Sequence, residues 1–283
     1  MRLIDEISFF LKENGFDSSV RLLHGFDVIC TRTAGSSEER IILPLEIGSP
    51  SEEEAARAAE EASECIRFIR SSEGYPLIIT EDRWRRQKNM TQARLLAHLE
   101  VFTTAYARNC EIRRIEKAEA QEFLKTHHSY GYAVCRYRYG LFLKRHTGHT
   151  RNDIPPGTLI AVATFSNARK WQKGERTIRS YEWTRYASLP NLRISGGMGK
   201  LLQAFIEEVN PDDIMSYADL EWSEGEAYGN LGFMLEAGKG PVMFRIDSGT
   251  WERTPVKPGI TEGNLYFRNF GSNKYRLKLT DYE

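Results

Sequence analysis

The stretch from Arg179 to Phe233 reads RSYEWTRYASLPNLRISGGMGKLLQAFIEEVNPDDIMSYADLEWSEGEAYGNLGF, and its order of patterns decides the fold. A β-rich run over residues 180–189 precedes the glycine cluster Gly196-Gly197-Met198-Gly199. A helix is expected directly behind the glycines, over residues 200–209, because apolar residues recur there at helical spacing. A second strand over residues 213–219 and a short helix before Gly232 complete the pattern.

This order of strand, glycines and helix favours an anion site. The first N–H groups of a helix have no partner within the helix, and the positive end of the helix dipole lies at the same point. Glycines allow a ligand to approach the backbone closely. The pattern therefore predicts a phosphate or pyrophosphate site at residues 196–200, and the structural alternative is a tight turn into a core helix.

Two short motifs in this stretch resemble those of the GCN5-related N-acetyltransferase (GNAT) superfamily. Residues 197–202, GMGKLL, resemble the Gly-x-Gly-Arg-x-Leu part of the family pattern, and residues 228–233, YGNLGF, match its Tyr-x-x-x-Gly-Phe part. The sequence departs from the pattern at Ile194, where the family has Gln or Arg, with Arg193 one place early. The resemblance covers the chain from about residue 112 to the C-terminus.

The resemblance implies a function and a set of cofactor contacts. It implies transfer of an acetyl group from acetyl-CoA, as co-substrate, to an amine that the sequence does not identify. Backbone N–H groups after the glycines would hold the pyrophosphate, and a backbone amide on the preceding strand would polarise the thioester carbonyl. The candidate cofactor-binding residues are Ala187, Arg193, Gly196, Gly197, Gly199 and Lys200.

The same resemblance implies a proton donor and leaves the base open. Tyr228 stands where the family tyrosine protonates the leaving thiolate, and a phenol has a pKa of about 10, of the same order as a thiol. Packing against Phe233 is its structural alternative. Glu182, in the middle of the expected strand, is the first candidate for the base, with Asp219 and Glu221 as alternatives.

A narrower likeness leads to a second hypothesis. Residues 81–84, 106–110 and 128–131 resemble a group of phage-type proteins that are similar to homing-endonuclease-associated polypeptides and carry a GNAT-like region. Residues 135–151 are basic and rich in aromatic residues, with no acid between Glu122 and Asp153. The alternative function is therefore a catalytically inactive, GNAT-like protein that binds nucleic acid. Its candidate contacts are Arg136, Arg138, Lys144 and Arg145.

The chain before residue 109 reads as a separate, smaller α/β unit. Strand, strand, helix and strand patterns follow one another there, and Pro44 indicates an edge strand or a local interruption. Asp27 and Glu46 resemble the paired acids of metal-dependent nucleases with the restriction-enzyme fold, but Gly48 replaces the usual lysine. We weigh three roles for these acids: ordinary strand-end residues, an active nuclease, and a decayed nuclease scaffold.

The predicted fold class is thus α+β. A mixed, mostly antiparallel sheet flanked by helices is expected over residues 109–283, behind the N-terminal unit of residues 1–108. Lysine plus arginine equals aspartate plus glutamate at 39 each, so net charge points to no polyanionic partner.

Composition also bounds the setting of the protein. The four cysteines lie far apart without CxxC spacing, so no metal is expected and free thiols suit a reducing cytoplasm. No run approaches the length of a membrane span, and the N-terminus has no long apolar region, so a cytoplasmic protein is expected. Oligomeric state stays open.

Overall fold

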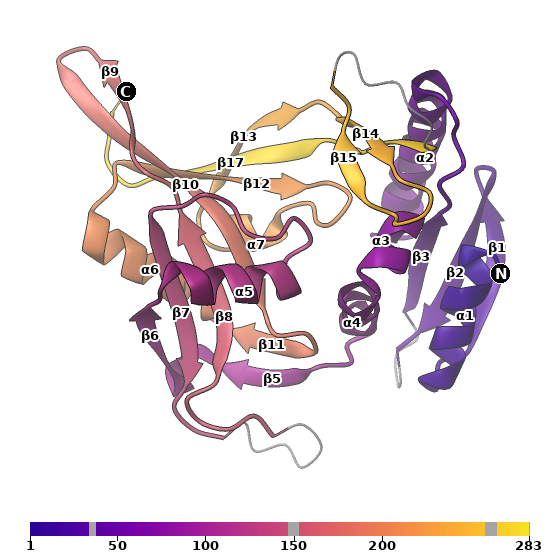
Figure 1. The fold of residues 1–283 in the computed structure, drawn as a ribbon, viewed down its shortest axis with the longest axis horizontal. Helices are drawn as coiled ribbons and strands as arrows, with labels where there is room; N and C mark the ends of the chain where they lie inside the picture. The colour runs from indigo at the N-terminus through magenta and orange to yellow at the C-terminus, as the bar shows by residue number, and fades with distance from the viewer. Residues whose placement is uncertain (34–37, 147–152, 258–264, 283) are drawn as a thin grey trace. The chain divides into compact units, whose positions relative to one another are not determined.

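The computed structural model describes residues 1–33, 38–146, 153–257 and 265–282. The chain divides into two compact units, each built from separate segments (Figure 1). Unit 1 comprises Met1–Val101, Asp219–Ser223 and Lys239–Ser272, and unit 2 comprises Phe102–Ala218, Glu224–Gly238 and Asn273–Glu283. One continuous domain over residues 109–283 was expected; the structure instead returns two later segments of the chain to unit 1.

Unit 1 is built around a four-stranded sheet in the order β1-β2-β3-β4. The first three strands are antiparallel neighbours, and β4 is parallel to β3. Its elements before residue 102 are α1 (Leu3–Glu13), β1 (Ser18–Leu23), β2 (Phe26–Arg32), β3 (Glu39–Leu45), α2 (Glu52–Ser72), β4 (Leu77–Thr80), α3 (Glu81–Arg86) and α4 (Lys88–His98).

The alternation of side chains along β2 and β3 places α1 and α2 on opposite faces of this sheet. Ile29 and Ile42 share a buried cluster with α1, whereas Val28 and Leu43 share another with α2. Successive strand residues point to opposite faces, so both faces of these strands are apolar and both are covered. The sequence pattern of continuous apolar runs in the strands follows from this double burial.

Pro44 shows how the structure departs from one expectation. β3 is an inner strand rather than an edge strand. The pairing of β3 with β2 ends at Ile42. The backbone nitrogen of Pro44 lies beyond that point, so β2 requires no hydrogen bond from it and proline is tolerated. The alternative of a local interruption describes the structure.

The later segments complete unit 1. A three-stranded antiparallel sheet in the order β15-β14-β16 has a small core of its own around Ile246 and Phe244. An isolated bridge between Ser49 and Tyr266 ties this sheet to the main part of the unit. Its strands are β14 (Met243–Ile246), β15 (Arg253–Pro255) and β16 (Leu265–Arg268).

Unit 2 contains a larger sheet with the order β13-β17-β12-β10-β8-β7-β6, and β9 pairs with β10. The neighbours from β6 to β10 are antiparallel, whereas β10 and β12 are parallel. The elements are β5 (Thr103–Tyr106), η1 (Ala107–Asn109), β6 (Cys110–Arg114), α5 (Lys117–His127), β7 (Tyr137–Leu143), β8 (Leu159–Phe165), β9 (Arg169–Lys173), β10 (Arg176–Ser188), β11 (Leu192–Ser195), α6 (Gly197–Val209), β12 (Asp213–Asp219), α7 (Glu226–Gly229), β13 (Met234–Lys239) and β17 (Ser272–Lys278).

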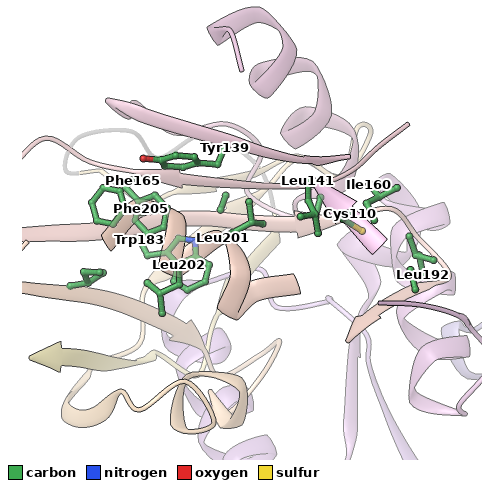
Figure 2. Packing of buried hydrophobic residues seen from close by; sticks show 14 of the residues in the cluster. Cys110, Tyr139, Leu141, Ile160, Phe165, Trp183, Leu192, Leu201, Leu202 and Phe205 are labelled. Atoms are coloured by element: carbon green, nitrogen blue, oxygen red, sulfur yellow. The ribbon is translucent and has the colours of Figure 1, made fainter. Parts of the chain in front are cut away.

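The two long helices of unit 2 cover opposite faces of its sheet. α6 packs Leu201, Leu202 and Phe205 against one face, where the Phe205 and Phe165 rings stack 3.9 Å apart (Figure 2). α5 covers the other face with Phe123 and its neighbours. The predicted α+β class, with a mixed and mostly antiparallel sheet flanked by helices, is confirmed. Among the described residues, no helix is long and apolar enough to cross a membrane.

Candidate active site

β10 and β12 separate partway along their length, and this separation positions the candidate site. Their parallel pairing covers Ser180–Glu182 and ends at Glu182 opposite Met215. Beyond that point β10 continues its pairing with β8 on the other side. The remaining residues of β12 therefore have no ladder partner in β10, and the sheet opens between the two strands.

A β-bulge lies where the strands separate. Trp183 pairs with Phe165 and Arg185 pairs with Thr164, so Thr184 is an extra residue in β10. Without the bulge, side chains three residues apart would point to opposite faces. The extra residue turns Arg185 to the same face as Glu182, and bulges commonly redirect a side chain in this way.

That face is the one covered by α5. Ala187, two residues beyond Arg185, belongs to the buried cluster of α5, whereas Trp183 belongs to the cluster of α6. The Nε of Arg185 donates to the carbonyl oxygen of Gly131, in the segment that follows α5, at 3.0 Å. Glu182 and Arg185 thus stand on the α5 side of the opening, both half-buried.

The glycine turn begins α6 close to the open part of β10. Gly196 has a φ of 74°, which favours glycine. A Cβ on Gly197 would lie 2.7 Å from Cγ2 of Ile194 and 3.5 Å from the Tyr186 hydroxyl, and one on Gly199 would lie 3.3 Å from Leu231. The turn is therefore packed between β11, β10 and the segment after α7, and side chains there would collide with it.

The start of α6 narrows the predicted anion donors. The helix begins at Gly197, earlier than expected, and the backbone N–H of Lys200 donates to the carbonyl oxygen of Gly196. The Lys200 ammonium group donates to the carbonyl oxygens of Ala107 and Cys110. Among the described residues, Gly197, Met198 and Gly199 have backbone N–H groups without a hydrogen-bond partner, so they are the donors that an anion can use.

Tyr228 lies on α7 beside the opening. Its hydroxyl is 2.8 Å from that of Ser216 on β12, and the Ser216 hydroxyl is 2.9 Å from the carbonyl oxygen of Trp183. The Ser216 hydroxyl is placed to donate to either oxygen, and when it donates to the Tyr228 hydroxyl, the phenol proton is left for another acceptor. Burial raises the pKa of Tyr228 above its ordinary value, against the opposing effects of Ser216 and Arg185. The phenol therefore keeps its proton at neutral pH.

The backbone of β10 changes the expectation for Ala187. The N–H of Leu189 donates to the carbonyl oxygen of Ile160 on β8. The backbone N–H groups of successive residues point to opposite sides of a strand. Residues two apart therefore point to the same side, and the N–H of Ala187 also faces β8. The neighbouring amides of Tyr186 and Ser188 face away from β8, toward the open side. A donor for a carbonyl oxygen in the opening would come from these residues.

The other predicted residues lie in different surroundings. Arg193 is exposed on β11, with its guanidinium carbon 5.3 Å from the centre of the Phe102 ring. Asp219 and Glu221 belong to unit 1, whereas Glu182 and Tyr228 belong to unit 2. Asp219 accepts the N–H of Glu221 and lies 3.7 Å from Nη2 of Arg83.

Glu221 is the centre of a buried charge cluster in unit 1. It is 1% exposed and accepts hydrogen bonds from Arg83 and Arg253, both at 2.6 Å. Burial alone would raise the pKa of Glu221, but the two arginines outweigh it and lower the pKa to about 2. Arg253 also contacts Asp82 at 2.7 Å. This carboxylate is fully engaged, which favours a structural role over that of a base.

The four predicted nucleic-acid contacts do not form one patch. Arg136 and Arg138 lie at the start of β7, and Lys144 and Arg145 follow its end. A strand rises about 3.3 Å per residue, so the seven residues of β7 separate the two pairs by roughly 20 Å. The guanidinium of Arg138 also donates to the carbonyl oxygens of Ile115 and Cys135, at 3.4 and 3.3 Å.

Asp27 and Glu46 line a cavity of about 290 Å³ in unit 1. Asp27 lies 3.6 Å from Nη1 of Arg2, and Glu46 accepts the backbone N–H of Leu3 at 3.0 Å. Within the described parts of the chain, no group of three or more histidine, cysteine, aspartate or glutamate residues is arranged to hold a metal ion. Both acids contact residues at the start of α1.

Sequence reasoning missed Ser216, Arg185 and the bulge at Thr184. Ser216 carried a visible signal, since it is a polar residue between Met215 and Tyr217 in the expected strand, and the structure leaves it 1% exposed. The bulge has no comparable signal in the sequence. Without it, strand alternation assigns Arg185 to the wrong face.

No protein-family model matches the chain, and no curated protein matches it. Three similar solved structures are a Bacillus subtilis acetyltransferase in complex with CoA, Arabidopsis thaliana NAA60 in complex with acetyl-CoA, and a GNAT-family acetyltransferase from Bacillus anthracis. Their identities to this chain are 13%, 9% and 12%, and their TM-scores are 0.36, 0.38 and 0.32. The matches cover 61%, 60% and 60% of this chain and 99%, 99% and 95% of those chains.

Proposed function

We propose that unit 2 transfers an acetyl group from acetyl-CoA to an amine. The observation that carries this proposal is the glycine turn with three backbone N–H groups without partners, packed beside the opening between β10 and β12 where the Tyr228 hydroxyl lies. An anion-binding helix start next to a buried phenol suits a phosphate-bearing thioester whose leaving group needs a proton. The sequence motifs at residues 197–202 and 228–233 support the same reaction.

Each step then has a group in unit 2 to carry it out. The amine nitrogen attacks the thioester carbonyl carbon, the new C–N bond forms and the C–S bond breaks. Glu182 accepts the proton that the amine loses, and the Tyr228 hydroxyl donates a proton to the departing thiolate. The amides of Tyr186 and Ser188 stabilise the oxyanion. The products are an N-acetyl amide and CoA with a free thiol.

The cofactor contacts follow from the start of α6. The amides of Gly197, Met198 and Gly199 would bind the pyrophosphate, with Arg193 adding positive charge from β11. Substituting Gly197 would place a side chain against Ile194, beside these amides. Cofactor binding is therefore expected to depend on Gly197 and not on the hydroxyl of Tyr228.

Titration of the full chain with acetyl-CoA, followed by thermal unfolding and calorimetry, tests the proposal. A ligand that binds only the folded state adds about 2.7 kcal/mol of stability at a hundredfold excess over its Kd. We expect saturable stabilisation that Gly197→Glu abolishes and Tyr228→Phe retains. Absence of stabilisation by acetyl-CoA or CoA, with the wild-type chain folded, would rule the proposal out.

A further inference from the structure

Arg185 is a half-buried cation that the proposed reaction does not use. Its Nε donates to the carbonyl oxygen of Gly131 at 3.0 Å and its Nη1 to that of Thr184 at 2.7 Å. Within the described residues, no carboxylate forms an ion pair with its guanidinium. Arg276, in the same unit, contrasts with it, because both Asp213 and Glu236 pair with that arginine.

One nitrogen of its guanidinium has no hydrogen-bond partner among the described residues. Nη2 of Arg185 makes no hydrogen bond among the described residues, and it is not one of the buried unpaired nitrogens. This nitrogen therefore reaches solvent. Two bonds to main-chain carbonyls hold the guanidinium in a fixed orientation, so little side-chain entropy is lost when an oxyanion binds the open edge.

The charge of Arg185 lies beside the reacting groups. Its guanidinium acts electrostatically on Tyr228 and Glu182, and the bulge at Thr184 places it on the face of Glu182. Two side-chain positions along one face of a strand are about 7 Å apart. A negative and a positive group thus stand next to each other on the α5 side of the opening.

We propose that Arg185 binds a carboxylate of the acceptor, so that the substrate is an amine that also carries a carboxylate. The ammonium group would approach Glu182, which takes its proton, while the carboxylate accepts hydrogen bonds from the open guanidinium edge. The planar guanidinium of Arg185 matches the shape of a planar carboxylate. The substrate would supply the carboxylate that no protein residue pairs with this arginine. This inference rests on the proposed acetyl transfer and names the class of its acceptor.

The test compares matched acceptors with saturating acetyl-CoA and follows release of the CoA thiol. Glycine is paired with glycinamide, and 4-aminobutyrate with 4-aminobutyramide. We expect kcat/KM to be at least about tenfold higher for the acid of at least one pair, since loss of a charged hydrogen bond of about 1.4 kcal/mol or more corresponds to that factor. Acids and amides used equally, or neither used while acetyl-CoA binds, would overturn the inference.

Variants separate recognition from folding. Arg185→Gln should reduce the preference for the acid to within about twofold, given loss of the charged hydrogen bond, yet keep the stabilisation by acetyl-CoA. Arg185→Lys keeps the positive charge but lacks the planar guanidinium. Its preference for the acid should lie between those of the wild type and Arg185→Gln, and it tests the proposal if the glutamine variant does not fold. Arg113→Gln, an exposed arginine on β6 paired with Glu111, is the matched control and should keep the full preference. A glutamine variant with unchanged preference would contradict the proposal.

The two proposals fail in different ways. Without stabilisation by acetyl-CoA, the acetyl-transfer proposal itself fails. With stabilisation, and with acetylation of uncharged amines alone, acetyl transfer stands and the role of Arg185 is refuted.

Discussion

At the scale of the residue, Tyr228 is the most direct test of the chemistry. Tyr228→Phe removes the hydroxyl that lies 2.8 Å from Ser216 and keeps the ring that packs near Trp183 and Phe233. We expect kcat to fall by about 10²- to 10⁴-fold, the usual contribution of a positioned acid, with binding of acetyl-CoA unchanged. Thiol-release kinetics and acetyl-CoA calorimetry measure the two effects separately.

The pH dependence of this step has a definite sign. Burial raises the pKa of Tyr228, so its acid form persists to higher pH than that of a free phenol. We therefore expect no loss of kcat from ionisation of Tyr228 below about pH 10, the ordinary value for tyrosine. A falling limb of kcat near pH 8 that disappears in Tyr228→Phe would show that the phenol ionises early.

Glu221 gives a prediction about stability rather than activity. Glu221→Gln leaves Arg83 and Arg253 buried without their shared carboxylate. Breaking a buried ion pair by removing one partner costs about 3–5 kcal/mol, which urea unfolding of the full chain can measure. Glu252→Gln, whose exposed carboxylate pairs with Arg86, is the control and should change stability by less than about 1 kcal/mol.

The contribution of the Glu221 carboxylate to folding stability depends on pH. Its pKa is lowered from 4.5 in the unfolded chain to about 2 in the folded protein. Its contribution is therefore complete above the unfolded pKa and is lost as the pH falls through the folded value. The stability difference between the wild type and Glu221→Gln should stay constant above about pH 5 and narrow toward pH 2.

The family resemblance identified Tyr228 and Glu182 as candidates but not their surroundings. The motif around Gly232 marks the tyrosine, whereas its bond to Ser216 depends on how β12 and α7 meet. Glu221, after the end of the next expected strand, stood as an alternative base to Glu182. Only the fold shows that Arg83 and Arg253, 138 and 32 residues away along the chain, surround it.

At the scale of the element, the turn at the start of α6 leaves less space for a side chain at Gly197 than at Gly199. A Cβ on Gly197 would lie 2.7 Å from the β-branched side chain of Ile194, whereas one on Gly199 would lie 3.3 Å from the end of the flexible Leu231 side chain. We expect Gly197→Ala to cost about 1–3 kcal/mol as an overpacked site, and Gly199→Ala clearly less. Thermal unfolding of both variants measures the difference, and equal losses would contradict this account of the turn.

Most elements could be predicted from periodicity, and the exceptions have physical reasons. The strand at residues 213–219 follows its apolar pattern closely. β1, β9 and β13 were missed because each is largely exposed, so no burial pattern marks them. The start of α6 was placed three residues late, since glycines count against a helix unless packing requires them.

At the scale of the whole molecule, the two units have separate cores, and a ligand at α6 should affect them differently. Hydrogen exchange of the full chain with and without acetyl-CoA measures this directly. We expect slower exchange at residues 197–199 and 228–233 and no change in β2 or β3 of unit 1. Equal protection of both units would show that binding is not confined to the glycine turn.

The division of the chain could be predicted only in part. A boundary was expected near residue 108, and unit 2 starts at Phe102. No sequence pattern indicates that Lys239–Ser272 belongs to unit 1, because its strands have the same patterns as strands that would close the sheet of unit 2. Discontinuous units depend on contacts between distant segments, and local patterns do not contain them.

Unit 1 is built from segments that lie far apart in the sequence, and this has a consequence for synthesis on the ribosome. Met1–Val101 emerges first, yet its buried Asp82 and Arg83 wait for Glu221 and Arg253, which are made much later. At 5–20 residues per second, the remaining segments follow after on the order of 10–30 s. During that interval the nascent N-terminal segment carries Asp82 and Arg83 without these later partners.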